Sequence, residues 1–192
     1  MELSMRKLIL RLSVAATLAT GAGKAAATDL NVNFTANVLE TTCQMKLMGG
    51  TGSDTKQELT IGTNGQVRLD AVKAGTAAAP FQIAIVECPS SLQSLKATVK
   101  GDASGYLFTG LKNQILPTSG GSNYSAVEIA RQGATDAPFL INSTEDAKRL
   151  VWTPAEISTG KVDLIATLRE TQTDKMTTGA FRGIATFEFS YE

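Results

Sequence analysis

Apolar and polar residues alternate along much of the chain, which is the pattern of β-strands with one buried face. The first such segment is LNVNFTANV at residues 30–38. Its apolar positions, which all share one side of an extended strand, are Leu30, Val32, Phe34, Ala36 and Val38. Polar residues, three of them asparagine, fall on the other side. We therefore predict a strand here that buries one face only.

Similar signals follow in series, separated by turn residues. We expect strands over 80–89, 95–101, 125–132, 161–170 and 183–192. The first of these, PFQIAIVECP, is apolar on both faces and is predicted to be a buried strand. MGGTGSDTKQ, residues 48–57, is expected to be a loop. No segment keeps a helical period over three turns, so an all-β antiparallel sandwich is predicted.

The N-terminal segment has the features of a secretory signal. Basic residues in MRKLILR precede an apolar run, and Ala25, Ala26 and Ala27 supply the small residues of a cleavage site. We predict cleavage after Ala27, which makes residues 1–27 the signal peptide and leaves 165 residues as one domain. A membrane anchor is the alternative, although the apolar run is shorter than the roughly 20 residues of a spanning helix.

Charge and cysteine content limit the possible partners and the compartment of this protein. The predicted signal removes four of 18 basic and one of 18 acidic residues, so the mature net charge is −3. A mildly acidic chain without basic clusters argues against nucleic acid or anionic membranes as partners. The two cysteines, Cys43 and Cys88, suggest a disulfide in an oxidising compartment, with two free thiols as the alternative.

The composition argues against catalysis. The chain has no histidine, so neither a Ser-His-Asp nor a Cys-His arrangement is available. No pair of carboxylates stands out for a glycosidase, and no spacing suggests a metal site. We expect no enzyme activity, no cofactor and no small-molecule substrate. Trp152 is expected in the core or at a strand edge, with sugar stacking as the alternative.

The two ends of the mature chain predict an interaction between copies. The last predicted strand stops with only Glu192 after Tyr191, so we expect no closing strand behind it. The strand at 30–38 lies outside the loop between the two cysteines. A sandwich short of one strand exposes core side chains and an unpaired edge, which a strand from a neighbour could cover.

Three segments in this order resemble chaperone–usher pilins, the subunits of bacterial fimbriae. TDLNVNFTANVLETTC resembles the donor extension of minor type 1 fimbrial subunits, and FQIAIVECP resembles the strand that carries the second cysteine. GAFRGIATFEFSYE resembles the family's C-terminal motif, with glycine fourteenth from the end and a penultimate tyrosine. The resemblance covers essentially all of the mature chain.

The resemblance implies an incomplete immunoglobulin-like sandwich that lacks its last strand and is completed by a donor strand from another subunit. It implies a donor-strand extension at 28–40 and a pilin domain at 41–192. The residues implied to border the groove and to pair with the chaperone are Gly179, Phe181, Ala185, Phe187, Phe189 and Tyr191. The implied partners are a periplasmic chaperone, the outer-membrane usher and neighbouring subunits, on an extracellular fimbrium.

Two details refine this expectation. The family usually has glycine at the fourth groove-facing position of the extension, where this chain has Ala36. The donor strand begins almost at Thr28, as in adaptors of the tip fibrillum, so we expect a minor subunit that joins the rod to a tip adhesin. The alternative is a secreted immunoglobulin-like module that binds carbohydrate.

Overall fold

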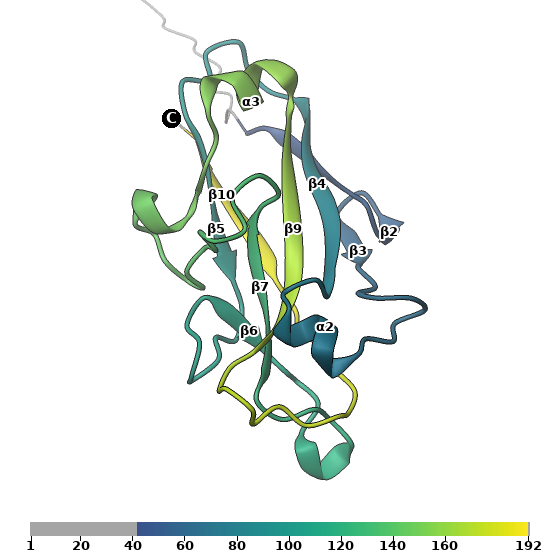
Figure 1. The fold of residues 1–192 in the computed structure, drawn as a ribbon. Helices are drawn as coiled ribbons and strands as arrows, with labels where there is room; N and C mark the ends of the chain where they lie inside the picture. The colour runs from purple at the N-terminus through teal and green to yellow at the C-terminus, as the bar shows by residue number, and fades with distance from the viewer. Residues whose placement is uncertain (1–41, 192) are drawn as a thin grey trace, which may run out of the picture. The chain divides into compact units, whose positions relative to one another are not determined.

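The computed structural model describes residues 42–191, which form two antiparallel sheets and a small hairpin (Figure 1). The chain divides into two units, 1–39 and 40–192, and the description here concerns the second. The predicted signal and the strand at 30–38 lie outside the described residues. In the part that is described, no helix is long and apolar enough to cross a membrane.

The larger sheet has five strands. In spatial order they are β1 (Gln44–Met48), β4 (Ala78–Glu87), β9 (Lys161–Glu170), β7 (Ser125–Arg131) and β6 (Gly110–Lys112). All neighbouring pairs run antiparallel. This order places β1 at one edge of the sheet and β6 at the other.

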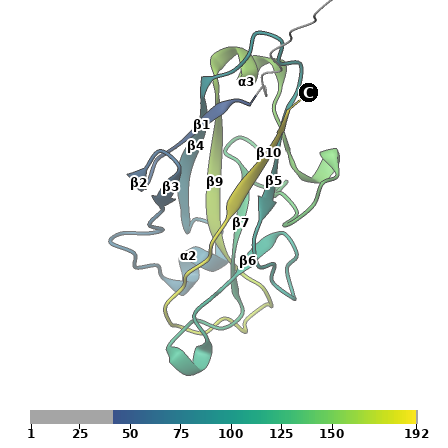
Figure 2. The same cartoon turned by 180° about the vertical axis from the view of Figure 1, so that it is seen from behind.

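The smaller sheet has three strands, in the order β10 (Thr186–Tyr191), β5 (Leu95–Lys100) and β8 (Leu150–Val151). Both of its pairs are also antiparallel. A separate hairpin joins β2 (Thr51–Ser53) to β3 (Lys56–Glu58). Figure 2 shows β10 on the side of the molecule that also carries β1.

Within residues 42–191, helical structure is limited to segments of three to six residues. The elements are α2 (Leu69–Lys73), α3 (Pro154–Thr159) and the 3₁₀ turns η1 (Pro117–Ser119) and η2 (Asp146–Lys148). The start of α3 is fixed by a capping box, in which Thr153 and Glu156 satisfy each other's backbone N–H groups. Gly160 ends this helix in the left-handed region, at φ 70°, and leads directly into β9.

The core lies between the two sheets. Ile83 and Leu164 from the large sheet and Leu95, Val99 and Leu150 from the small one are fully buried. Trp152 is only 4% exposed and belongs to this core, which confirms the structural prediction for it rather than sugar stacking. The predicted all-β antiparallel sandwich is confirmed.

Two local predictions were wrong. Residues 48–57 are not one loop, because they contribute the short strands β2 and β3, which pair around a turn at 54–55. β4 is not buried on both faces, since Val86 is 60% exposed and Pro80 also faces outward. Pro80 and Val86 are apolar, yet in the described residues no second layer covers them.

Candidate functional site

A row of aromatic side chains on β10 faces the core without being fully covered. In the antiparallel register Phe187 lies opposite Val99, Phe189 opposite Ala97 and Tyr191 opposite Leu95. Directly paired residues place their side chains on the same face of a sheet. The three partners on β5 are 0% exposed, whereas the three aromatics are only partly buried. The core-facing row of β10 is therefore open on the side away from β5.

The first strand of the large sheet has the same property. Met45 lies opposite Ile85 and Leu47 opposite Ile83 in the pairing of β1 with β4. Ile83 is fully buried, but Met45 and Leu47 are only partly buried against the core. These two side chains thus sit on the core-facing side of an edge strand and keep part of their surface exposed.

Both strands have one neighbour each among residues 42–191: β1 pairs only with β4, and β10 pairs only with β5. The free edges belong to opposite sheets of one sandwich. We call the strip formed by Met45, Leu47, Phe187, Phe189 and Tyr191 the β1–β10 seam. A free edge carries unpaired N–H and C=O groups, so the seam combines an apolar strip with two hydrogen-bonding edges.

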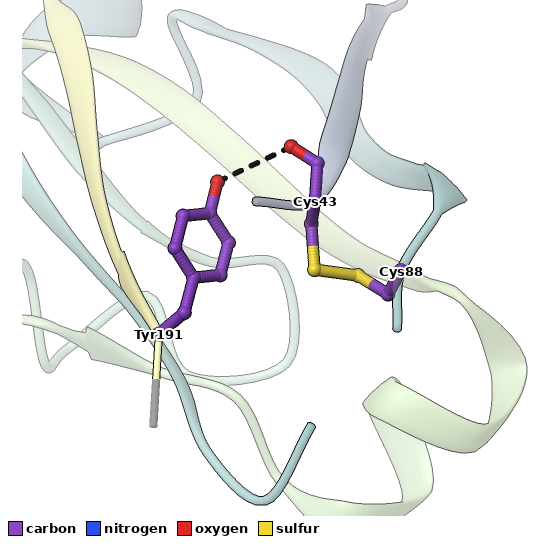
Figure 3. The surroundings of a disulfide bond; sticks show 3 residues. All are labelled: Cys43, Cys88 and Tyr191. Atoms are coloured by element: carbon purple, nitrogen blue, oxygen red, sulfur yellow. Dashed lines mark hydrogen bonds between the residues drawn. A yellow bond between two sulfur atoms is a disulfide. The ribbon is translucent and has the colours of Figure 1, made fainter. Parts of the chain in front are cut away.

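Two contacts connect the sides of the seam. The ring of Phe187 packs against Phe81 of β4, with ring centroids 6.0 Å apart and planes tilted by 52°. At the other end the phenol of Tyr191 donates a hydrogen bond to the backbone carbonyl oxygen of Cys43 over 3.3 Å (Figure 3). Burial of this phenol raises the pKa of Tyr191 above its ordinary value.

Cys43 and Cys88 form the predicted disulfide, with their Cα atoms 4.3 Å apart (Figure 3). Cys43 immediately precedes β1, and Cys88 immediately follows β4. The bridge thus fixes β1 to β4, its one partner strand among residues 42–191, at the end of the seam where Tyr191 lies. No free thiol remains, because these are the two cysteines of the chain.

The remaining predicted groove residues precede β10. Phe181 and Ala185 are partly buried against the core, while Gly179 lies further back in the chain. Gly179 has φ +150°, and a Cβ there would lie 2.5 Å from the backbone nitrogen of Ser122. Its neighbour Ala180 exchanges backbone hydrogen bonds with Gly120 and Ser122. Glycine is therefore required where this segment approaches the 120–122 loop.

The seam thus brings together three of the six predicted groove residues on one strand, with Phe181 and Ala185 on the segment that leads to it. The five predicted donor residues, Leu30 to Val38, lie outside the described part of the chain. Met45 and Leu47 were missed by the sequence analysis. Their signal was available, because Cys43, Met45 and Leu47 alternate with polar Gln44 and Lys46.

The outward positions of both strands are polar. On β10 they are Thr186, Glu188 and Ser190, and Glu188 forms an ion pair with Lys100 of β5 at 3.3 Å. On β1, Lys46 pairs with Asp54 at 3.0 Å. Among the described residues no group of three or more acidic or cysteine side chains is arranged to hold a metal ion.

Comparison with known proteins agrees with this geometry. A family model described as "Fimbrial protein" matches residues 32–192. The fimbrial-like protein YadM of Escherichia coli K12 is 30% identical over 174 residues, which cover 86% of this chain and 88% of that protein.

Two solved pilus subunits align with this chain. The P pilus rod subunit PapA aligns with a TM-score of 0.51 and 17% identity, covering 84% of this chain and all of PapA. The P pilus adaptor subunit PapF aligns with a TM-score of 0.46 and 16% identity, covering 81% of this chain and 100% of PapF. The likeness to PapA confirms the predicted immunoglobulin-like sandwich that lacks a strand.

Proposed function

This chain belongs to the fimbrial protein family and is a pilus subunit, and we propose that it is the adaptor that joins a fimbrial rod to its tip adhesin. In this proposal it assembles by donor-strand exchange. Its own groove accepts a strand from a neighbour, and its own extension at residues 28–40 completes another subunit. The family places the assembled protein in an extracellular pilus on the bacterial surface.

The observation that carries the assembly mechanism is the β1–β10 seam. Phe187, Phe189 and Tyr191 lie on the face whose partners on β5 are completely buried, yet they remain partly exposed. An inserted strand would cover these side chains and would pair with the free edges of β1 and β10 at about 1 kcal/mol per hydrogen bond. Strand addition at an open sheet edge is a general mode of peptide recognition.

The segment at 30–38 has the complementary pattern. Leu30, Val32, Phe34, Ala36 and Val38 recur at every second residue, and only one face of an added strand can point into a groove. Burial of a large apolar side chain contributes about 1.5–3 kcal/mol. A strand with this alternation therefore suits a groove lined by aromatic and aliphatic side chains.

Before assembly the seam needs another cover, since an exposed apolar strip with free edges promotes aggregation. A periplasmic chaperone that lends a strand to β10 would provide it, and the usher would exchange that strand for the extension of the next subunit. The adaptor position is supported by the short segment between the predicted cleavage site and the donor strand.

The test compares two periplasmically expressed chains, Thr28–Glu192 alone and the same chain followed by a linker and a second copy of Leu30–Leu39. We expect the plain chain to be labile or aggregated and the extended chain to be a stable monomer. Thermal unfolding by circular dichroism and the mass in solution provide the readouts. A plain chain that is already a stable monomer, unchanged by the extra strand, would refute donor-strand completion.

A matched control uses the appended copy with Phe34→Asp. One charged carboxylate in an apolar groove is strongly unfavourable, so this copy should not stabilise the domain. The adaptor position is tested separately, by deleting the gene in a fimbriated host. Rods without adhesin at their tips are the expected result, whereas loss of the rod itself would make the protein a rod subunit.

A further inference from the structure

A second feature of the domain lies at the end where β7 begins and η1 protrudes (Figure 1). A cavity of about 170 Å³ opens there between the loops at 104–125 and Thr171. Tyr106 and Tyr124 line it and pack against each other, with ring centroids 5.6 Å apart and planes tilted by 45°. Donor-strand assembly assigns no role to this pair.

The backbone of Tyr124 is held in an unfavourable conformation. Its φ is +51°, in the left-handed region that residues other than glycine, asparagine and aspartate rarely adopt. Hydrogen bonds on both sides maintain it: its N–H donates to the Asn123 side chain, and its carbonyl accepts from Thr171 N–H. Thr177 fixes Asn123 in turn through its hydroxyl and its N–H. Backbone strain that the surroundings enforce in this way is typical of functional sites.

Hydroxyl groups form much of the remaining wall. Ser104, Ser122 and Ser125 line the cavity and are each about 5% exposed or less. The Ser122 and Ser125 hydroxyl oxygens lie 2.6 Å apart, so one donates to the other. The Thr171 hydroxyl is buried and has no hydrogen-bond partner among residues 42–191. A hydroxyl both donates and accepts, which leaves further hydrogen-bonding capacity in this wall.

The charge of the wall limits the class of ligand. Lys112 is its one ionic side chain, and it pairs with Asp102 at 3.7 Å. Without an unpaired cation the cavity does not favour an anion. Its hydroxyl-rich lining does not favour a purely apolar ligand. An aromatic pair beside hydroxyl and amide groups matches a neutral sugar ring, which has one apolar C–H face and a rim of hydroxyls.

From these observations we propose that the cavity is a binding site for a neutral pyranose, with the exposed ring of Tyr106 stacking on the sugar. Tyr106 is 62% exposed, and its phenol makes no hydrogen bond within residues 42–191. Tyr124 holds the Tyr106 ring at the opening. The site lies on elements other than β1 and β10, so the proposal does not depend on donor-strand exchange or on the adaptor position.

The test measures saturation-transfer NMR on the extended chain, Thr28–Glu192 with the appended copy of Leu30–Leu39, which is expected to be a stable monomer. The ligands are glucose, galactose, mannose and N-acetylglucosamine at millimolar concentration. At least one sugar should receive saturation from the protein. Tyr106→Ala should weaken its binding about tenfold, equivalent to about 1.4 kcal/mol. Phe108→Ala is the matched control, because Phe108 is 67% exposed nearby but does not line the cavity. The affinity of the Phe108→Ala variant for the sugar should change less than about twofold, a loss of at most about 0.4 kcal/mol.

A second variant separates binding from folding. Thr171→Val removes the unpartnered hydroxyl at nearly constant volume, so the melting temperature should stay the same or rise. Sugar binding should nevertheless fall. No transfer to any of the four sugars by the folded protein would overturn the proposal. Equal losses in Tyr106→Ala and Phe108→Ala would overturn it as well, since the effect would then be nonspecific.

Discussion

The hydrogen bond between Tyr191 and Cys43 tests whether the end of β10 is fixed to the start of β1. Tyr191→Phe removes the phenol oxygen and keeps the ring that packs beside Phe189, with centroids 6.4 Å apart. The variant therefore removes one contact between the two sheets and leaves the apolar row intact. We expect a measurable but small loss of stability.

The magnitude follows from the geometry. An intramolecular hydrogen bond contributes about 0.5–1.5 kcal/mol, and the 3.3 Å between the phenol oxygen and the Cys43 carbonyl is long for this type. Cys43 is only 8% exposed, so little water can replace the lost donor. A loss of about 1 kcal/mol is expected, which for a domain of this size lowers the melting temperature by about 2–4 °C.

The assay is thermal and urea unfolding of the extended chain, which carries the second copy of Leu30–Leu39. Tyr106→Phe is the control. Tyr106 is well exposed and its phenol has no hydrogen bond in the described domain, so this variant should match the parent within about 0.5 kcal/mol. Equal melting temperatures for Tyr191→Phe and the parent would show that the contact contributes nothing in solution. A loss above about 3 kcal/mol would mean that the ring had moved.

The contact between Tyr191 and Cys43 also predicts that the stability of the folded chain depends on pH. Burial raises the pKa of Tyr191 in the folded chain, so the unfolded chain ionises first, near pH 10. The stability that neutral Tyr191 contributes is complete below that pH, and it is lost as the pH rises through the pKa of Tyr191 in the folded chain. The difference in stability between the parent and Tyr191→Phe should therefore shrink between pH 9 and 11. A difference that stays constant over this range would refute the argument from burial.

Three further changes should have larger effects. Replacing both Cys43 and Cys88 by serine should cost roughly 4 kcal/mol, the chain-entropy value for a 45-residue separation, measured by urea unfolding. Leu164→Ala, at a fully buried position, should cost about 3–5 kcal/mol, whereas Val86→Ala on the exposed face of β4 should cost under about 0.5. Gly179→Ala should reduce the yield of soluble domain, because its Cβ would lie 2.5 Å from a backbone nitrogen; a normal yield and melting temperature would contradict this.

Strands with a strict alternation were predictable from sequence, because burial on one face leaves a period of two. β9 has the predicted bounds of 161–170, and β5 and β7 each end one residue before the prediction. The hairpin β2–β3 was not predictable in this way. Its six residues are mostly exposed on both faces, so no apolar period marks them. It depends instead on contacts such as the hydrogen bond from Leu47 N–H to the Asp54 carbonyl.

For the seam, the apolar row of β10 was predictable from sequence, but its exposure was not. The aromatic row of β10 was visible in the sequence, since Phe187, Phe189 and Tyr191 alternate with polar residues. That this row remains half exposed is a property of the sheet order, which ends at β10 and separately at β1. Sheet order depends on pairings between residues far apart in the chain, such as Tyr191 with Leu95. A local pattern contains no information about them.

Assembly and the proposed sugar site meet at Asn113. Its side-chain NH₂ donates to the carbonyls of Ser122, in the cavity wall, and Ala180, on the segment that leads to β10. Its side-chain oxygen accepts from the N–H groups of Ile115 and Arg182. The bonds with Ser122 and Ile115 lie within the loop itself, and those with Ala180 and Arg182 hold this loop against the segment that leads to β10. Because the exposed Tyr106 ring takes no part in this network, its truncation should affect sugar binding alone, whereas changes at Asn113 would disturb binding and the seam together.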